Sequence, residues 1–135
     1  MNGIIIIDKP QEWTSNDVVS RLRRVFNTRR IGHGGTLDPM ATGVLPVFVG
    51  RATRGVEFFE HAQKVYETTI RFGLTTDTED ITGKTITECA VSLTEEELLA
   101  VLPRFRGEIM QVPPMYSAIK VNGQKLYDLA RKGRE

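Results

Sequence analysis

The sequence of 135 residues is poor in the residue types that form cross-links and bind metals. It has one cysteine, Cys89, and two histidines, so it offers no internal disulfide and no Cys/His cluster for a metal. Its longest aliphatic run covers residues 4–7, far short of the roughly 20 residues of a membrane-spanning helix. Asp8, Lys9 and Pro10 interrupt that run too early for a signal peptide. We therefore expect a cytoplasmic protein with no membrane and no metal among its partners.

The charge is distributed unevenly along the chain. Apolar residues make up 40% and charged residues 26% of the sequence, which is typical of a globular domain. The net charge is +1, yet residues 1–54 contain eight Lys or Arg and only four Asp or Glu. This local excess indicates a polyanionic partner, because phosphate contacts supply most non-specific affinity for nucleic acids. A solvated helix face would explain the same pattern, so both interpretations stay open at this point.

Hydrophobic periodicity predicts an α+β fold with a mixed, largely antiparallel sheet and flanking helices, because strands and helices interleave while short turns join some strands. Residues 3–7 form a β-branched strand, and the capping-box spacing of Thr14 and Asp17 starts a helix near Ser15. Pro46 limits its own strand to a sheet edge or an irregular position. The expected apolar stripe of the first helix is Val18, Leu22, Val25 and Phe26. Further strands are expected at 44–49, 65–72, 85–91 and 116–121. Helices are expected at 53–63, between Thr94 and Pro103, and at 126–131. Loops are expected at 32–43 and 73–83, and a tight turn at 122–123.

The loop at residues 32–43 encloses a single carboxylate, Asp38, among glycines and small residues. Pro39 fixes its own φ and pushes Asp38 toward an extended conformation, so the loop should be stiff. A carboxylate that acts as nucleophile or base must be ionised, and in an apolar pocket this requires a neighbouring Arg or Lys. The common alternative is an Asx-Pro turn in which Asp38 caps its own backbone. The loop at residues 32–43 contains no lysine and does not match the GxxxxGK[ST] pattern, which argues against a nucleotide-binding loop.

A second acidic segment contains Asp77, Glu79 and Asp80 and superficially suggests a cation site. Gly83 falls too late for the calcium-loop pattern. We therefore expect a hydrogen-bonded loop between two strands.

The run GGTLDP at residues 34–39, followed by ATGVL at 41–45, resembles the catalytic motif of the TruB family of pseudouridine synthases. Glu12 stands where a glycine is common in that family. The other matching segments, in order, are KP at 9–10, WTS at 13–15, KVY at 64–66, TDT at 76–78 and PPMYSAIK at 113–120. The resemblance covers essentially the whole chain. It implies that residues 1–135 are the N-terminal part of a pseudouridine synthase catalytic domain, without a C-terminal RNA-binding domain.

The resemblance also implies an activity and a set of site residues. Members of this family convert the uridine at position 55, in the T loop of tRNA, to pseudouridine, and they use no metal, nucleotide or redox cofactor. Asp38 matches the essential aspartate, with nucleophile and base both open as its role. Tyr66 matches a tyrosine that stacks on the flipped base, although a strand tyrosine is more often a core residue. His33 matches a histidine at the T loop, although a lone histidine is usually structural. The remaining substrate-binding candidates are Lys9, Gly34, Gly35 and Thr36.

Arginines ahead of the loop are candidates for contacts with the RNA backbone. The expected partner is the T stem-loop of tRNA, and no guide RNA is expected. The resemblance places the charge partner of Asp38 in a later segment, so we expect a missing C-terminal half as a possible complement. Two functions stay open: an RNA-modifying enzyme represented by its N-terminal part, and a non-catalytic RNA-binding or structural fragment. The four favoured arginines are Arg21, Arg24, Arg29 and Arg30.

Overall fold

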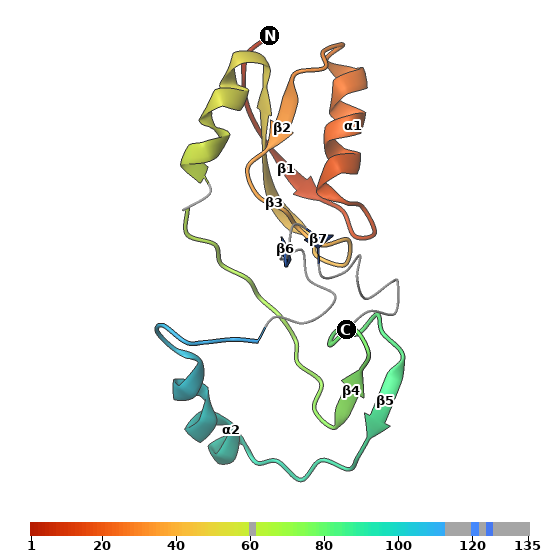
Figure 1. The fold of residues 1–135 in the computed structure, drawn as a ribbon, viewed down its shortest axis with the longest axis vertical. Coiled ribbons are helices and arrows are strands. Elements are labelled where there is room, and N and C mark those ends of the chain that lie inside the picture. The colour runs from red at the N-terminus through yellow and green to blue at the C-terminus, as the bar shows by residue number, and fades with distance from the viewer. Residues whose placement is uncertain (60–61, 113–119, 122–123, 126–135) are drawn as a thin grey trace. The chain divides into compact units, whose positions relative to one another are not determined.

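A computed structural model describes residues 1–59, 62–112, 120–121 and 124–125, which divide into two compact units, Met1–Tyr66 and Glu67–Glu135 (Figure 1). Three expected features lie wholly or largely outside the described residues: the strand at 116–121, the turn at 122–123 and the helix at 126–131. Among the helices of the described part, none combines the length and the apolar character needed to span a lipid bilayer.

The first unit is built on a three-stranded antiparallel sheet. Its strands are β1 (Gly3–Lys9), β2 (Ile31–His33) and β3 (Gly43–Val49), in the order β1-β3-β2. Val49 is paired with Gly3 on one side and with Ile31 on the other, so β3 is the central strand. The strands expected at 3–7 and 44–49 are confirmed, with slightly wider bounds. The expected loop at 32–43 is wrong at its start, because β2 extends to His33 and pairs with β3.

Pro46 lies in the central strand, so its expected edge or irregular position is wrong. The Pro46 carbonyl accepts a 2.8 Å hydrogen bond from the Gly34 N–H, just beyond the end of β2. The nitrogen of Pro46 faces the same side as its carbonyl, so its missing N–H falls at the end of the β2–β3 ladder. The pairing of Pro46 with Ile6 across β1 and β3 is undisturbed. A central strand therefore tolerates this proline because one partner strand ends beside it.

Helix α1 (Ser15–Val25) begins where the capping box predicts it. The Thr14 hydroxyl accepts the Asp17 N–H at 3.1 Å, and the Asp17 carboxylate accepts the Thr14 N–H at 2.8 Å. Val18 is buried against the sheet, with Leu22 and Phe26 partly buried beside it. The expected stripe is wrong for Val25, which is 63% exposed: it is the last helical residue, and Phe26 at the C-cap occupies the place against the core.

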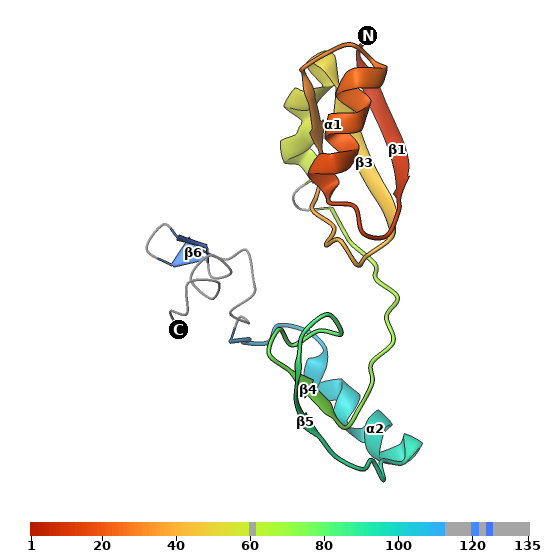
Figure 2. The same cartoon turned by 90° about the vertical axis from the view of Figure 1, so that its right-hand side faces the viewer.

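The sheet of the first unit is covered differently on its two faces. Alternate residues of β3 point to one face and join the α1 core, namely Leu45, Val47 and Val49. On the other face, Phe48 meets Phe59 edge to face, with ring centroids 5.0 Å apart. Phe59 ends η1 (Gly50–Phe59), a 3₁₀ helix that begins three residues before the helix expected at 53–63. The expectation is wrong at its end, because residues 62 and 63 are not helical. Figure 2 shows α1 and η1 on opposite sides of the sheet.

The second unit contains a hairpin, a short helix and a further strand pair. Strands β4 (Leu74–Thr76) and β5 (Thr85–Glu88) pair antiparallel, so the loop expected from residue 73 is wrong over β4, and the strand expected at 85–91 ends early. Residues 65–71 belong to no strand, which makes the strand expected at 65–72 wrong: the described residues provide no ladder partner for it. Strands β6 (Lys120–Val121) and β7 (Gln124–Lys125) also pair antiparallel.

The second capping box is confirmed in α2 (Glu95–Val101), where Thr94 and Glu97 hold each other's backbone N–H groups. The α-helix ends before Pro103, as expected, and the chain continues through the proline as the 3₁₀ turn η2 (Leu102–Phe105). Proline at the start of such a turn loses no intrahelical hydrogen bond.

The acidic segment between β4 and β5 is a hydrogen-bonded turn, as expected. Asp80 accepts hydrogen bonds from the hydroxyl and N–H of Thr82 and from the Thr78 hydroxyl. The Thr82 hydrogen bond is the main reason that the pKa of Asp80 lies below its ordinary value. Asp77 in turn accepts the N–H of Lys84 at 2.7 Å. These carboxylates therefore close the hairpin.

Candidate active site

Asp38 lies in the loop between β2 and β3 with its side chain exposed. Its backbone carbonyl accepts the Ala41 N–H at 3.0 Å, so the turn is closed by the backbone. Among the described residues, the carboxylate makes no hydrogen bond or ion pair, so the alternative Asx-Pro turn is not formed. The expected Arg or Lys partner is likewise not found within these residues. The loop thus presents an available carboxylate.

Lys9 stabilises this loop through hydrogen bonds to backbone carbonyls. Its side chain is fully buried, and its ammonium donates to the carbonyls of Pro10 at 2.9 Å, Trp13 at 2.6 Å and Pro39 at 3.4 Å. A buried ammonium is tolerated only when its donors are satisfied, and three carbonyl oxygens match its three N–H groups. The contact with Pro39 ties the end of β1 to the residue after Asp38. This placement favours a role in holding the loop over direct contact with a substrate.

Gly34 and Gly35 are required by the shape of the loop. A Cβ on Gly34 would lie 2.8 Å from the Phe48 ring and 3.3 Å from Phe59, so the backbone passes directly over the aromatic pair. Gly35 has φ +130°, a conformation that other residues rarely adopt. The Gly35 carbonyl is hydrogen-bonded to Nδ1 of His33. Since a carbonyl can only accept, Nδ1 carries the proton, and Nε2 of a neutral His33 is an acceptor.

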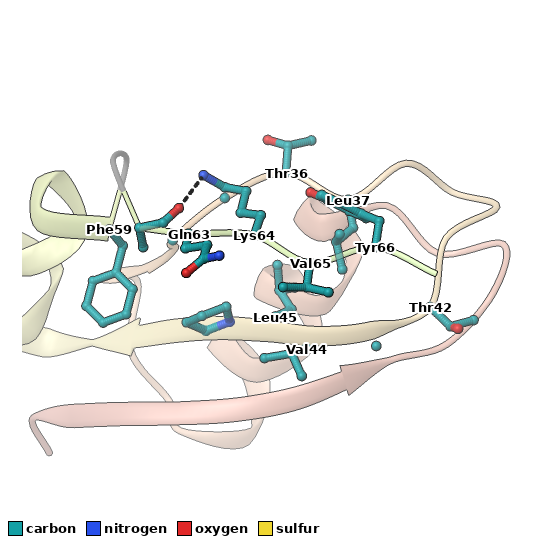
Figure 3. Close-up of a pocket in the computed structure, with 15 residues that line it drawn as sticks. Thr36, Leu37, Thr42, Val44, Leu45, Phe59, Gln63, Lys64, Val65 and Tyr66 are labelled. Carbon is teal, nitrogen blue, oxygen red and sulfur yellow. Dashed lines mark hydrogen bonds between the residues drawn. The ribbon is translucent and has the colours of Figure 1, made fainter. Parts of the chain in front are cut away.

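A cavity of about 560 Å³ opens beside the loop, a size in the usual range for small-ligand sites. Figure 3 shows its walls: the loop through Thr36 and Leu37, the start of β3, and the segment 62–66 ending at Tyr66. The cavity is mainly apolar, with Val44, Leu45 and Val65 among its lining residues. Such a lining, with few polar groups, suits a flat heterocyclic ligand.

Several sequence-predicted site residues meet around this cavity. Gly34, Gly35, Thr36 and Tyr66 all line it, and Tyr66 is 62% exposed. Tyr66 is therefore available for stacking and is no core residue. Asp38 is not part of the lining but follows Leu37, which is.

His33 and Lys64 belong to a neighbouring cavity of about 360 Å³, together with Gly35 and Thr36. Lys64 also borders the larger cavity, and its ammonium donates to the Ala62 carbonyl at 3.3 Å (Figure 3). Lys64 is not among the site residues predicted from the sequence, although the KVY segment that contributes Tyr66 contains it. A cation on this wall would favour an anionic ligand.

The four favoured arginines occupy two places. Arg21 and Arg24 are exposed on α1 and border a hollow that also contains Trp13. Glu12 and Asp17 border the same hollow, so its charge is balanced. The other pair precedes β2: Arg29 and Arg30 are exposed, and Nε of Arg30 donates to the Thr53 hydroxyl at 3.1 Å. Within the described ranges, no group of three or more His, Cys, Asp or Glu residues could hold a metal ion.

A family model described as TruB family pseudouridylate synthase (N terminal domain) matches residues 23–135. The chain belongs to the TruB family. It is 52% identical over 134 residues to the tRNA pseudouridine synthase B of Gluconacetobacter diazotrophicus, and 55% identical over 134 residues to that of Gloeobacter violaceus. These alignments cover 99% and 98% of the chain but only 44% and 46% of the two relatives. The chain thus spans less than half the length of these TruB relatives.

A solved structure agrees with the TruB assignment. The crystal structure of a Cbf5-Nop10-Gar1 complex contains a chain that is 32% identical and aligns with a TM-score of 0.59. The alignment covers 87% of this chain and 31% of the other. The α+β fold expected from the sequence, of the pseudouridine synthase type, is confirmed by this match and by the antiparallel sheets.

Proposed function

We propose that this chain is the N-terminal part of an enzyme that converts uridine 55 in the T loop of tRNA to pseudouridine, with Asp38 as the catalytic carboxylate. The observation that carries the proposal is the available carboxylate of Asp38, the residue next to Leu37 in the wall of a cavity that Tyr66 also lines, in a chain of the TruB family. The names of the relatives, tRNA pseudouridine synthase B, support tRNA as the substrate.

The proposed reaction breaks the bond between the ribose C1′ and N1 of uracil and forms a bond from C1′ to C5. The C5 hydrogen is released, and N1 gains a proton. Asp38 acts in its ionised form, either by attack on the ribose or base or by removal of a ribose proton. Both roles require a carboxylate whose lone pairs are not engaged by the loop, which agrees with its lack of hydrogen bonds to described residues.

Recognition uses the groups around the loop. The target base must leave the RNA stack, and the exposed ring of Tyr66 offers a face on which uracil can stack. Thr36 and the loop backbone at Gly34 and Gly35 supply polar groups at the same cavity. His33 offers Nε2 to a donor of the T loop. One or two of the candidate arginines contact phosphates of the T stem-loop, and the candidates are Arg21, Arg24, Arg29 and Arg30.

The test follows the C5 hydrogen. A T-arm stem-loop carrying 5-tritiated uridine releases tritium to water only when C5 becomes bonded to C1′. The chain is assayed with the C-terminal remainder of the Gloeobacter violaceus relative, either fused or mixed. We expect release with native Asp38 and a loss of about a thousandfold or more with Asp38→Asn. Asp8→Asn, which removes an exposed carboxylate at the end of β1, is the matched control and should stay active.

A second function is a non-catalytic RNA-binding or structural fragment. It is favoured by the lack of a cationic partner for Asp38 among the described residues. It predicts that the stem-loop binds while tritium release stays at background for native and variant alike, even with the C-terminal remainder present. Full release by Asp38→Asn would instead refute Asp38 as the catalytic group.

A further inference from the structure

The residue before Asp38 is held by a single buried hydroxyl. Ser15, at the first turn of α1, is 2% exposed. Its Oγ accepts the Leu37 N–H at 3.0 Å and donates to the Leu37 carbonyl at 3.3 Å. One side chain thus satisfies both backbone groups of a residue 22 positions away in the sequence.

Pro39, the residue after Asp38, is held by residues at the end of β1 and just before α1. The Pro39 carbonyl accepts the Glu12 N–H at 2.7 Å and the Lys9 ammonium at 3.4 Å. Asp38 therefore lies between two anchored neighbours. The Leu37 side chain adds a third constraint, since it packs against the core cluster of α1 and the sheet.

The Ser15 hydroxyl is not needed to cap its own helix. Thr14 is the N-cap residue, and its side chain accepts the Asp17 N–H. The hydroxyl of Ser15 is directed to Leu37 instead, and a buried hydroxyl is favourable only with such partners. Helix formation and loop positioning are thus assigned to two adjacent hydroxyls, which makes them separable by mutation.

We propose that Ser15 is a positioning residue for Asp38: its hydroxyl fixes Leu37, and thereby aims the Asp38 carboxylate at the cavity lined by Tyr66. The inference rests on the proposed catalytic role of Asp38. A displacement of a reacting group by about 1 Å costs on the order of a hundredfold in rate. Loss of the hydroxyl leaves both backbone groups of Leu37 without their partner and lets the loop shift, while the cavity walls formed by the start of β3 and by residues 62–66 remain.

The first test separates turnover from binding. Ser15→Ala and Thr14→Ala are compared in the chain combined with the C-terminal remainder, using the tritium assay. For Ser15→Ala we expect kcat to fall about ten- to a hundredfold, with KM within about threefold of the native value. Thr14→Ala removes the helix cap but keeps the Ser15 hydroxyl, so it should lower Tm and leave kcat within about threefold. Ser15→Thr keeps the hydroxyl and should restore most of kcat.

The second test measures the hydrogen bond between the Leu37 N–H and the Ser15 hydroxyl by amide hydrogen exchange. Exchange of the Leu37 amide should be about tenfold or more faster in Ser15→Ala than in native protein or Thr14→Ala. Across all variants, kcat should follow the protection of this amide. Native kcat in Ser15→Ala, or an equal loss in Thr14→Ala, would overturn the positioning role. Full activity of Asp38→Asn would refute the proposed function itself. That outcome is distinct from the Ser15→Ala and Thr14→Ala results that would overturn only the positioning role.

Discussion

At the scale of single residues, Gly34 shows how closely the loop is packed on the sheet. The missing side chain leaves room for the Phe48 ring, which is itself buried and in contact with Phe59. A methyl group at Gly34 would lie 2.8 Å from the Phe48 ring, so the ring or the loop would have to shift to make room for it. The same contact fixes where the loop leaves β2.

We predict that Gly34→Ala destabilises the first unit by about 1–3 kcal/mol through overpacking. Gly3→Ala is the matched control, because a Cβ on Gly3 would meet no atom within 4 Å. Restricting the unfolded chain there should leave stability unchanged or slightly raised. Urea unfolding of the two variants measures the difference, and equal midpoints would contradict the packing account.

Lys9 shows that a motif residue can support the site without facing a ligand. Its resemblance to a family motif suggested substrate binding, whereas its ammonium contacts three backbone carbonyls in the interior. Lys9 at the end of β1 and Ser15 at the start of α1 both connect to the backbone of the loop around Asp38. Both residues act on the backbone of the loop.

At the scale of elements, the start of α1 depends on the charge of Asp17. Hydrogen bonds from the Thr14 side chain and backbone lower the pKa of Asp17 below its ordinary value. A carboxyl group whose pKa is lower in the folded protein stabilises that state above the unfolded pKa, close to 3.8. This stabilisation is lost as the pH falls through the folded pKa.

We therefore expect native protein to be more stable than Asp17→Asn at pH 7, with the difference shrinking as the pH falls below about 4. Thermal unfolding followed by circular dichroism between pH 7 and pH 3 measures it. Glu57→Gln removes an exposed carboxylate of η1, outside the capping box, and is the control. A difference independent of pH would show that the capping box does not depend on the charge of Asp17.

At the scale of the whole molecule, the first unit has an apolar sheet face that is only partly covered. Ile4 and Ile6 on β1 are 51% and 61% exposed, and Val44 on the neighbouring strand is 70% exposed. Within the described part of the chain, β1 pairs only with β3, so its other edge is open. An open edge with exposed isoleucines promotes association between chains.

Ile6→Lys should reduce self-association of the chain and change its stability by less than about 0.5 kcal/mol, because the side chain is already largely exposed. Ile7→Lys, on the same strand but packed against the core, should destabilise it by at least about 2 kcal/mol. Sedimentation velocity over a concentration series reports the association. Unchanged association of Ile6→Lys would mean that another surface is responsible.

Local patterns in the sequence determined much of this protein. The capping boxes at Thr14 and Thr94 and the strands near residues 3–7 and 44–49 follow from residues close together in the chain. The TruB family could be recognised from the GGTLDP motif, because the motif is long and contiguous. Asp38 and Tyr66 as catalytic and stacking residues remain predictions.

Only the tertiary structure decided how these segments meet. The strand at Ile31–His33 is too short for a periodic signal, and the central place of Pro46 depends on where that strand ends. Ser15 and Leu37 are 22 residues apart, and Lys9 and Pro39 are 30 apart. Helix caps and strand periodicity arise within a few residues of one another, so a sequence displays them. Contacts across such distances exist only once α1 has packed on the sheet, which is why the positioning of Asp38 could not be predicted from its motif.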